Sequence, residues 1–251
     1  MNTARFPSWC LCLLLAGCGA ENTGSPVQAP GAPAAASTRL LEAGAAALQD
    51  MPPVDALNAY LDGFHFYSGH MAGQMEAHHY CSIVNEDVIQ CVVYDGNVRE
   101  AKLMGVEYIV SRRLYEGLPP TEQRLWHSHV HEVKSGQLIL PGVPELAERA
   151  LMRKLVDTYG KTWHTWHTDR DKALPLGVPQ LMMGATADGQ IDPARVAERD
   201  RRFGIDSAAK RAERADIPTP PVHPAADAWQ RGPAYQIDDP AGAHHEAAPA
   251  R

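Results

Sequence analysis

The chain contains no apolar run of 18 or more residues, and this absence argues against a membrane-spanning helix. It also lacks a basic stripe. Its 23 Lys and Arg residues stand against 30 Asp and Glu residues, which gives a formal charge of −7. Nucleic-acid binding depends on Lys and Arg to neutralise phosphates, so no nucleic-acid partner is expected.

Cysteine is scarce as well, with five in 251 residues. Cys10 and Cys12 lie in an apolar stretch that follows Arg5, as in a secretory signal peptide. The sequence LAGC at 15–18 then has the form of a bacterial lipobox, in which the cysteine is acylated and becomes the first residue. We therefore predict a lipoprotein signal peptide over 1–17 and lipidation (palmitate and related acyl chains) at Cys18. An ordinary signal peptide or a chance apolar start is the alternative.

This N-terminus predicts where the protein lies. Two or three acyl chains on Cys18 anchor a protein stably, whereas one chain is marginal. Gly19, in place of Asp, favours the outer membrane. We expect a lipid-anchored protein of the bacterial cell envelope that faces the periplasm. The Pro- and Ala-rich residues 18–37 are expected to form a flexible linker, and about 20 such residues reach roughly 25 Å.

Periodicity and turn residues predict the elements of the remaining chain. Helices are expected over 38–49, 54–60, 70–77, 118–126, 144–159 and 194–203, and strands over 80–84, 88–94, 101–111, 127–133, 137–140, 161–168 and 180–184. Helices followed by strands with helices between them favour a single α+β domain over 38–205, with a mainly antiparallel sheet and flanking helices. Residues 206–251 are expected to be a C-terminal extension with little regular structure.

The best-defined of these elements is a hairpin formed by 80–84 and 88–94. Its predicted register places Cys81 opposite Cys91. Facing cysteines on paired strands can close a disulfide, and an exported protein meets oxidising conditions. Two buried thiols remain the alternative.

Several stretches of the sequence resemble the oil body-associated protein family. They are GFHFYSG (63–69), EAHHYC (76–81), QCVVYD (90–95), GVEYIVS (105–111), LWHSH (125–129), VKSG (133–136), YGKTW (159–163), TDR (168–170), LPLG (174–177) and PAADAW (224–229). The resemblance covers residues from about 54 to 238.

The resemblance implies little about activity. Plant relatives associate with seed oil bodies, bacterial relatives have no known function, and the family has no established enzymatic activity. Association with lipid surfaces is the property that carries over. The lipobox and linker depart from the plant pattern and put a lipid-droplet location in doubt. Some plant members keep the paired cysteines in a reducing compartment, which implies that the disulfide is optional to the fold.

Residues able to do chemistry are densest over 125–136. In a strand, His127, His129 and His131 would share one face. Neighbours two apart are separated by roughly 6.6 Å, so two rings can share one metal ion at about 2.0–2.1 Å each. His127 and His131 would lie roughly 13 Å apart and cannot. A site would therefore use His129 with one of its two neighbours.

Further ligands must come from other stretches, and His65, His78 and His79 belong to stretches shared with the family. The hypothesis is a divalent metal site, for zinc or iron, formed by His65, His79, His127 and His129. The cupin pattern also begins with His-x-His, but Glu132 comes too early for it and 119–126 looks helical. The alternative is that these histidines are polar or hydrogen-bonded residues of a half-buried strand, with no cofactor.

Nucleophilic catalysis has less support. Ser128 points away from its neighbouring histidines, and no G-x-S-x-G elbow occurs. A thiolate pair of Cys81 or Cys91 with His79 is a weaker explanation of these residues than pairing of the two strands. His164 and His167 are expected at exposed polar positions.

Two functions remain open. The first is a membrane-anchored lipoprotein that binds lipid or an envelope protein without catalysis. The second is a metal-dependent hydrolase or oxygenase built around His127 and His129. A purely structural envelope protein is a third interpretation.

Overall fold

The computed structural model describes residues 21–238, so the predicted signal peptide and Cys18 lie outside the described residues. No helix in the described range is both long and apolar enough to span a membrane.

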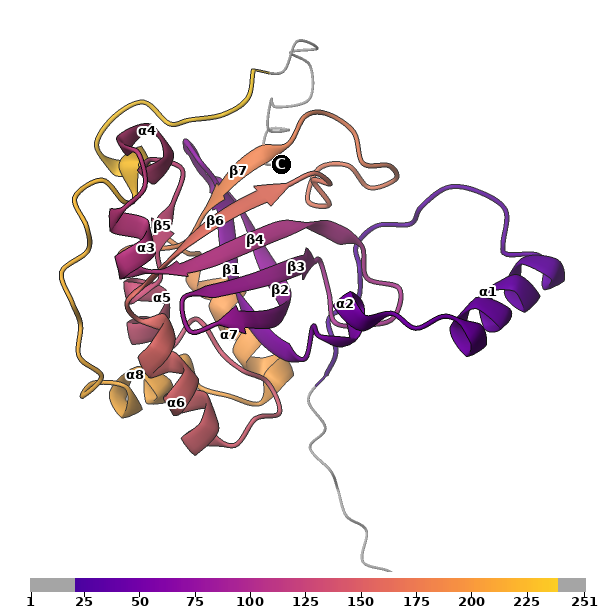
Figure 1. Ribbon diagram of the computed structural model, residues 1–251, viewed down its shortest axis with the longest axis horizontal. Helices are drawn as coiled ribbons and strands as arrows, with labels where there is room; N and C mark the ends of the chain where they lie inside the picture. The colour runs from indigo at the N-terminus through magenta and orange to yellow at the C-terminus, as the bar shows by residue number, and fades with distance from the viewer. Residues whose placement is uncertain (1–20, 239–251) are drawn as a thin grey trace, which may run out of the picture.

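The described chain is organised around an antiparallel sheet that closes on itself (Figure 1). Its strands are β1 (Ala59–Tyr67), β2 (His70–Asn85), β3 (Val88–Tyr94), β4 (Leu103–Ser111), β5 (His127–Ser128), β6 (Thr158–His164) and β7 (Gln180–Met183). The order is β4-β3-β2-β1-β7-β6-β5, and β4 also pairs with β6, which closes six strands into a cylinder. The α+β class and antiparallel pairing are confirmed. The closure was not predicted.

The helices lie around this cylinder. They are α1 (Ala36–Leu48), α2 (Pro52–Asp55), α3 (Arg112–Glu116), α4 (Pro120–Gln123), α5 (Val130–Ser135), α6 (Glu145–Leu155), α7 (Pro193–Phe203), α8 (Ser207–Glu213) and the 3-10 turn η1 (Ala228–Gln230). In Figure 1, α3, α5, α6 and α8 gather at one end of the cylinder, whereas α1 projects away from it. Asp192 caps α7 by accepting a hydrogen bond from the Ala194 amide, as a helix N-cap does.

The interior of the cylinder has two apolar clusters with a polar layer between them. Three strands each carry a polar residue between a member of one cluster and a member of the other: Leu61–His65–Tyr67 on β1, Cys81–His79–Ala77 on β2 and Ile109–Glu107–Met104 on β4. Burial of charged and imidazole groups is costly unless they are paired or bind a ligand. This layer is therefore where the fold departs from an ordinary apolar core.

One predicted element near the N-terminus is wrong. Residues 70–77 are predicted as helix but form the first half of β2, which pairs with β1. The two strands pair along most of their length, with Leu61 opposite His79 and His65 opposite Met75. This pairing is a tertiary interaction, and it overrides local propensity. The predicted register of Cys81 opposite Cys91 is present between β2 and β3.

The predicted strand over 127–133 is also wrong. Pairing with β6 ends at Ser128, and α5 begins two residues later with His129 at its N-cap. The Val133 amide donates to the His129 carbonyl at 3.0 Å, which is helical rather than strand bonding. His127 thus lies at the start of the short strand β5, and His129 lies at the start of the helix α5.

Segments at both ends of the described range pack on the domain. The Thr23 amide donates to Asn97 Oδ1 at 2.7 Å, and Val27 is buried, so this part of 18–37 lies against the sheet. In the C-terminal extension, α8 is regular structure where little was expected. Arg214 donates to the carbonyls of Val133 and Leu138 at 2.9 and 2.8 Å, and these contacts hold the extension on α5.

Candidate metal centre

Five side chains from separate elements meet in the polar layer of the cylinder. They are His65 (β1), His79 (β2), Glu107 (β4), His127 (β5) and His129 at the start of α5. Each is at most 5% exposed. They line a cavity of about 20 Å³, which has room for a single atom or water-sized group. We call these five residues the His–Glu centre.

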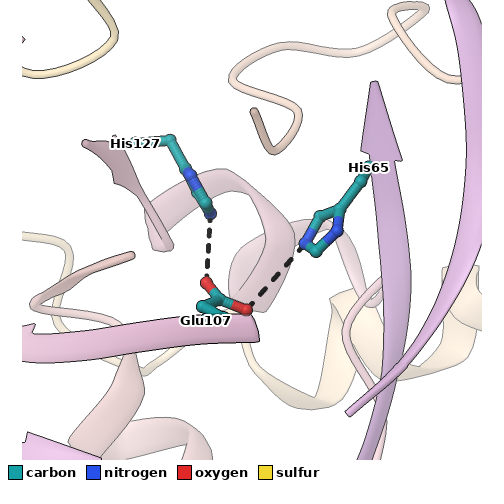
Figure 2. Close-up of side chains that lie close together, drawn as sticks. All are labelled: His65, Glu107 and His127. Carbon is teal, nitrogen blue, oxygen red and sulfur yellow. Dashed lines mark ion pairs between the residues drawn. The ribbon is translucent and has the colours of Figure 1, made fainter. Parts of the chain in front are cut away.

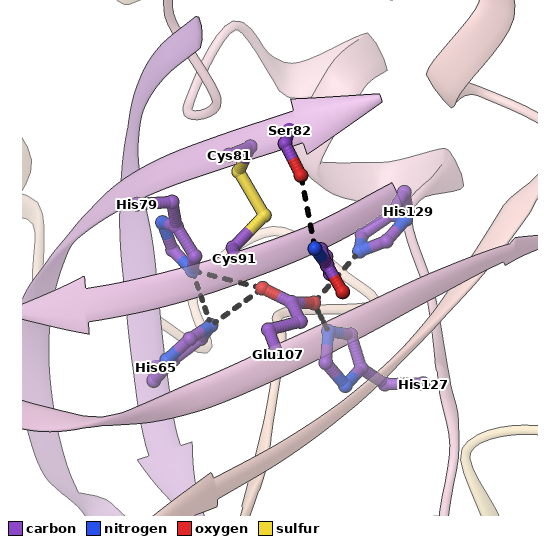
Figure 3. Close-up of a disulfide and its surroundings, with 9 residues drawn as sticks. His65, His79, Cys81, Ser82, Cys91, Glu107, His127 and His129 are labelled. Carbon is purple, nitrogen blue, oxygen red and sulfur yellow. Dashed lines mark hydrogen bonds and ion pairs between the residues drawn. A yellow bond between two sulfur atoms is a disulfide. The ribbon is translucent and has the colours of Figure 1, made fainter. Parts of the chain in front are cut away.

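Each of the four imidazole rings turns its Nε2 toward the Glu107 carboxylate (Figures 2 and 3). Oε2 lies 2.9 Å from His79 Nε2 and 3.9 Å from His65 Nε2. Oε1 lies 3.4 Å from His127 Nε2 and 3.3 Å from His129 Nε2. Donor atoms that share one tetrahedral ion at about 2.1 Å lie roughly 3.4 Å apart, so these separations match a metal site.

The hydrogen bonds of His129 fix which of its nitrogens carries the proton. The Thr158 hydroxyl donates to the Leu155 carbonyl at 2.7 Å, so it must accept from His129 Nδ1 at 2.8 Å. In a neutral ring, Nε2 then presents a lone pair to the Glu107 carboxylate. Two acceptors that face each other at 3.3 Å repel, and a cation between them removes the repulsion.

The protonation states favour the same conclusion. Burial lowers the pKa of His65 well below its usual range and also lowers the pKa of His129. Burial alone would raise the pKa of Glu107, but the surrounding histidines, His127 foremost, hold it well below its usual range. The centre therefore combines an ionised carboxylate with neutral rings at His65 and His129, which are the protonation states that metal binding requires. Burial would lower the pKa of His127, but Glu107 raises it above its usual value, so an ion that binds there displaces a proton.

Gly160 on β6 leaves the middle of the centre open. A Cβ atom at this position would lie against Glu107 Oε1, 2.8 Å from His129 Nε2 and 2.9 Å from His127 Nε2. Gly160 directly follows the helix expected over 144–159, but it lies in the sheet, where it pairs with His127. Because glycine has no side chain, the space between Glu107, His127 and His129 stays open for an ion.

A second carboxylate borders the centre. Glu132 on α5 has one oxygen within 4.8 Å of ring nitrogens of both His127 and His129. Burial raises its pKa to about 8, and its Oε2 has no hydrogen-bond partner among the described residues. Gly184 makes room for it, because a Cβ there would lie 2.5 Å from Oε2.

Sequence reasoning missed Glu107, Glu132 and Gly160. The available signal for Glu107 was a single acidic residue inside the otherwise apolar stretch GVEYIVS, because an ionisable residue on a buried strand is seldom without a partner. Nothing local marked Gly160, whose role depends on the pairing of β6 with β5.

Two residues named by the sequence do not join the centre. His78 points to the other face of β2, where its Nδ1 lies 2.8 Å from the Tyr60 hydroxyl and 3.2 Å from Asp62. His131 lies near Asp188, at 3.8 Å. The expectation that His78 or His131 supplies a ligand to the His–Glu centre therefore has no geometric support; His78 instead groups with Asp62 and Glu76, within 4.8 Å.

The remaining expectations concern Ser128, His164 and His167. Ser128 donates its hydroxyl to the Asp227 carboxylate at 2.8 Å rather than to a histidine. The expected exposure of His164 and His167 is wrong, since they are 0% and 2% exposed. His164 points into the closed sheet, where its Nε2 lies 3.3 Å from Nδ1 of His65. An open sheet would have left that face to solvent.

A disulfide joins Cys81 on β2 to Cys91 on β3, with their Cα atoms 4.0 Å apart. Cys81 lines the same cavity as the His–Glu centre, beside His79 (Figure 3). With both sulfurs bonded, the thiolate pair considered for Cys81 and His79 does not exist in this structure.

Comparison with known proteins gives one family. Residues 51–218 match the model described as "Protein of unknown function (DUF1264)". The chain is 42% identical to oil body-associated protein 1B of Arabidopsis thaliana over 214 residues, which cover 84% of this chain and 89% of that protein. It is 44% identical to oil body-associated protein 2A of Zea mays over 206 residues, covering 80% and 82%. No solved structure gives a significant match.

Proposed function

Because the chain belongs to the oil body-associated protein family, whose matched model is described as of unknown function, we propose a function from the geometry: the protein binds a divalent transition-metal ion at the His–Glu centre. The observation that carries this proposal is the convergence of four histidine Nε2 atoms on one buried carboxylate.

The cost of leaving this arrangement without a cation supports the proposal. A buried polar atom without a partner costs about 1–3 kcal/mol. Nε2 of His127 has no hydrogen-bond partner among the described residues, and the Glu107 carboxylate faces the lone pair of His129. An ion held by His65, Glu107 and His127, whose ligand atoms all lie within 4.8 Å of one another, would gain three donor groups already in place.

The donor set indicates the class of metal. Imidazole and carboxylate ligands suit zinc and iron, and thiolate is excluded while the disulfide is intact. A bound ion would supply Lewis-acid chemistry at a position that admits only a water-sized ligand. Around it, Glu107 supplies the negative charge and Thr158 orients the His129 ring.

Elemental analysis of the purified full-length protein tests the proposal. We expect about one equivalent of zinc or iron in the wild type and a loss of at least tenfold in bound metal in His127→Ala. His131→Ala is the matched control, because that ring lies toward Asp188 and should keep full metal content. Wild-type protein that binds no stoichiometric metal after incubation with zinc or iron(II) would rule the proposal out.

We also propose that Cys18 carries the lipid anchor and holds the protein at the periplasmic face of the cell envelope. The LAGC sequence at 15–18 supports this. Mass spectrometry of the N-terminal peptide should find an acylated Cys18, and Cys18→Ala should move the protein from the membrane fraction to the soluble fraction. An unmodified N-terminus would contradict the anchor.

A second candidate function, binding of a lipid acyl chain, is favoured by a groove on the outer face of β2 and β3. The groove has a volume of about 280 Å³, and its lining includes Tyr80, Val92 and Tyr94. Thr23, which bonds to Asn97 beside the groove, lies only five residues after Cys18, a reach of at most about 18 Å. A lipid-anchored N-terminus would therefore hold the groove near the bilayer.

Quenching of the full-length protein's tyrosine and tryptophan fluorescence by vesicles that contain brominated acyl chains tests this function. Val92→Asp should reduce the quenching severalfold, and Val143→Asp, at an exposed site outside the groove, should not. Equal quenching in both variants would remove the groove from consideration.

A further inference from the structure

We propose that reduction of the Cys81–Cys91 disulfide turns Cys81 into a thiolate ligand of the His–Glu centre, so that the redox state of this pair changes which metal ion the centre prefers. This inference rests on the proposed function and names a way in which that same site is regulated.

Strand register places the disulfide next to the centre. Cys81 pairs with Cys91, and Cys91 pairs in turn with Glu107 on β4. Directly opposed residues on antiparallel strands have their side chains on the same face, with Cβ atoms about 4.5–5.5 Å apart. Cys81 also follows His79 by two positions on β2 and so points to the same side. The disulfide and the centre therefore share the interior of the sheet.

The cavity gives a second, independent observation. Its lining combines Cys81 with all five residues of the centre, and Cys91 is not among the lining residues. Both cysteines are almost fully buried, at 1% and 4% exposure. A freed Cys81 thiol would meet the ion position or the apolar wall formed by Leu61 and Ile109. Figure 3 shows the disulfide above the Glu107 carboxylate.

The chemistry balances with a dithiol reductant. One dithiol attacks the disulfide, its two thiol protons and two electrons pass to the sulfurs of Cys81 and Cys91, and the reductant becomes a cyclic disulfide. Cys81 then loses its thiol proton to solvent as its sulfur bonds to the metal ion, and Cys91 stays a thiol. No other oxidant or reductant is needed.

A thiolate would change the metal preference. While the disulfide is intact, the His–Glu centre offers only nitrogen and oxygen ligands, which suit iron and manganese as well as zinc. Addition of sulfur favours the softer ions, zinc and copper(I), and disfavours manganese. The same fold would then carry one class of ion under oxidising conditions and another under reducing conditions.

Cobalt(II) spectroscopy on single-cysteine variants tests this without any reduction step. Cys91→Ser leaves Cys81 as a free thiol, and Cys81→Ser leaves Cys91 free. We expect full-length Cys91→Ser loaded with cobalt(II) to show the near-ultraviolet thiolate-to-cobalt charge-transfer band. Wild type, Cys81→Ser and the double serine variant should lack it. Zinc affinity of Cys91→Ser should exceed that of the double variant by about tenfold or more, since even residues outside the ligand shell contribute 10–100-fold.

Each outcome has a definite meaning. Cobalt binding in Cys91→Ser without the band overturns the inference and leaves the proposed function standing, whereas no cobalt binding in oxidised wild type overturns both. A band in Cys81→Ser but not in Cys91→Ser also overturns the assignment to Cys81. If Cys91→Ser does not fold, the same spectrum is recorded on wild type reduced with a dithiol, with two free thiols verified by titration. A missing band there is equally decisive.

Discussion

Asp227 and Ser128 lie 99 positions apart in the chain, yet the Asp227 carboxylate accepts hydrogen bonds from both the backbone amide and the hydroxyl of Ser128, at 2.9 and 2.8 Å. Ser128 separates His127 from His129. The contact thus ties the C-terminal extension to the residue between two members of the His–Glu centre, and it gives that extension a role in positioning their rings.

Asp227→Ala is expected to lower the free energy of unfolding by about 1–3 kcal/mol, because the buried Ser128 amide and hydroxyl lose their acceptor. Metal affinity should fall by about 10–100-fold, as for other residues that support ligands. Urea unfolding and zinc titration measure the two effects. Asp227→Asn is the control, since Asn keeps one acceptor oxygen and tolerates the φ of 54° at this position. Equal losses in both variants would contradict the positioning role.

Gly160→Ala is expected to abolish metal binding, since the added methyl group occupies the space between Glu107, His127 and His129. Overpacking should also cost about 1–3 kcal/mol of stability. Isothermal titration with zinc measures the binding. Gly117→Ala is the matched control, because its new Cβ would meet its nearest neighbour at an ordinary 3.5 Å. Retention of wild-type affinity in Gly160→Ala would show that the ion does not sit there.

Stability should decline as pH falls below about 6.5, with His167 as one contributor. Burial lowers the pKa of His167, whereas the unfolded residue titrates near 6.5. Between the two pKa values the unfolded chain binds a proton that the folded chain does not, so stability is lost on acidification, at up to about 1.4 kcal/mol per pH unit. Urea unfolding at pH 7.5 and pH 5 should show a smaller loss for His167→Gln than for wild type. An identical loss in both would exclude His167 as a source.

The free energy of unfolding of the Cys81→Ser, Cys91→Ser double variant is expected to be about 2–3 kcal/mol lower than that of wild type. The disulfide closes a loop across 10 positions of the chain, and its loss gives the unfolded chain more conformational freedom. Thermal and urea unfolding measure the difference, with dithiol-reduced wild type as the comparison. A double variant that is less stable than reduced wild type would indicate damage from the serines rather than loss of the bond.

The sequence predicted the parts of this structure that depend on local pattern. Residues 80–94 alternate around a polar loop, so the hairpin and the register of Cys81 with Cys91 could be read directly. His65 and His79 were named as partners of His127 and His129 because all four lie in family-like stretches, and the structure brings these four together.

The features that the sequence did not predict depend mainly on closure of the sheet. Glu107 lies in the middle of the centre only because β4 pairs with both β3 and β6. No local sequence pattern predicts that pairing. His164 is buried for the same reason. The alternation of histidines over 127–131 imitates a strand, so the turn into α5 at His129 was hidden. Asp227 acts from a segment whose composition predicts little structure.

The closure of β4 onto β6 has a kinetic consequence. An ion in the His–Glu centre would be surrounded by strands, with the helices at one end of the cylinder, so it could enter or leave only when part of that enclosure opens. Such openings are rare in a well-packed sheet. The bound ion would then exchange slowly with ions in solution, at a rate set by that opening as well as by the affinity of the centre.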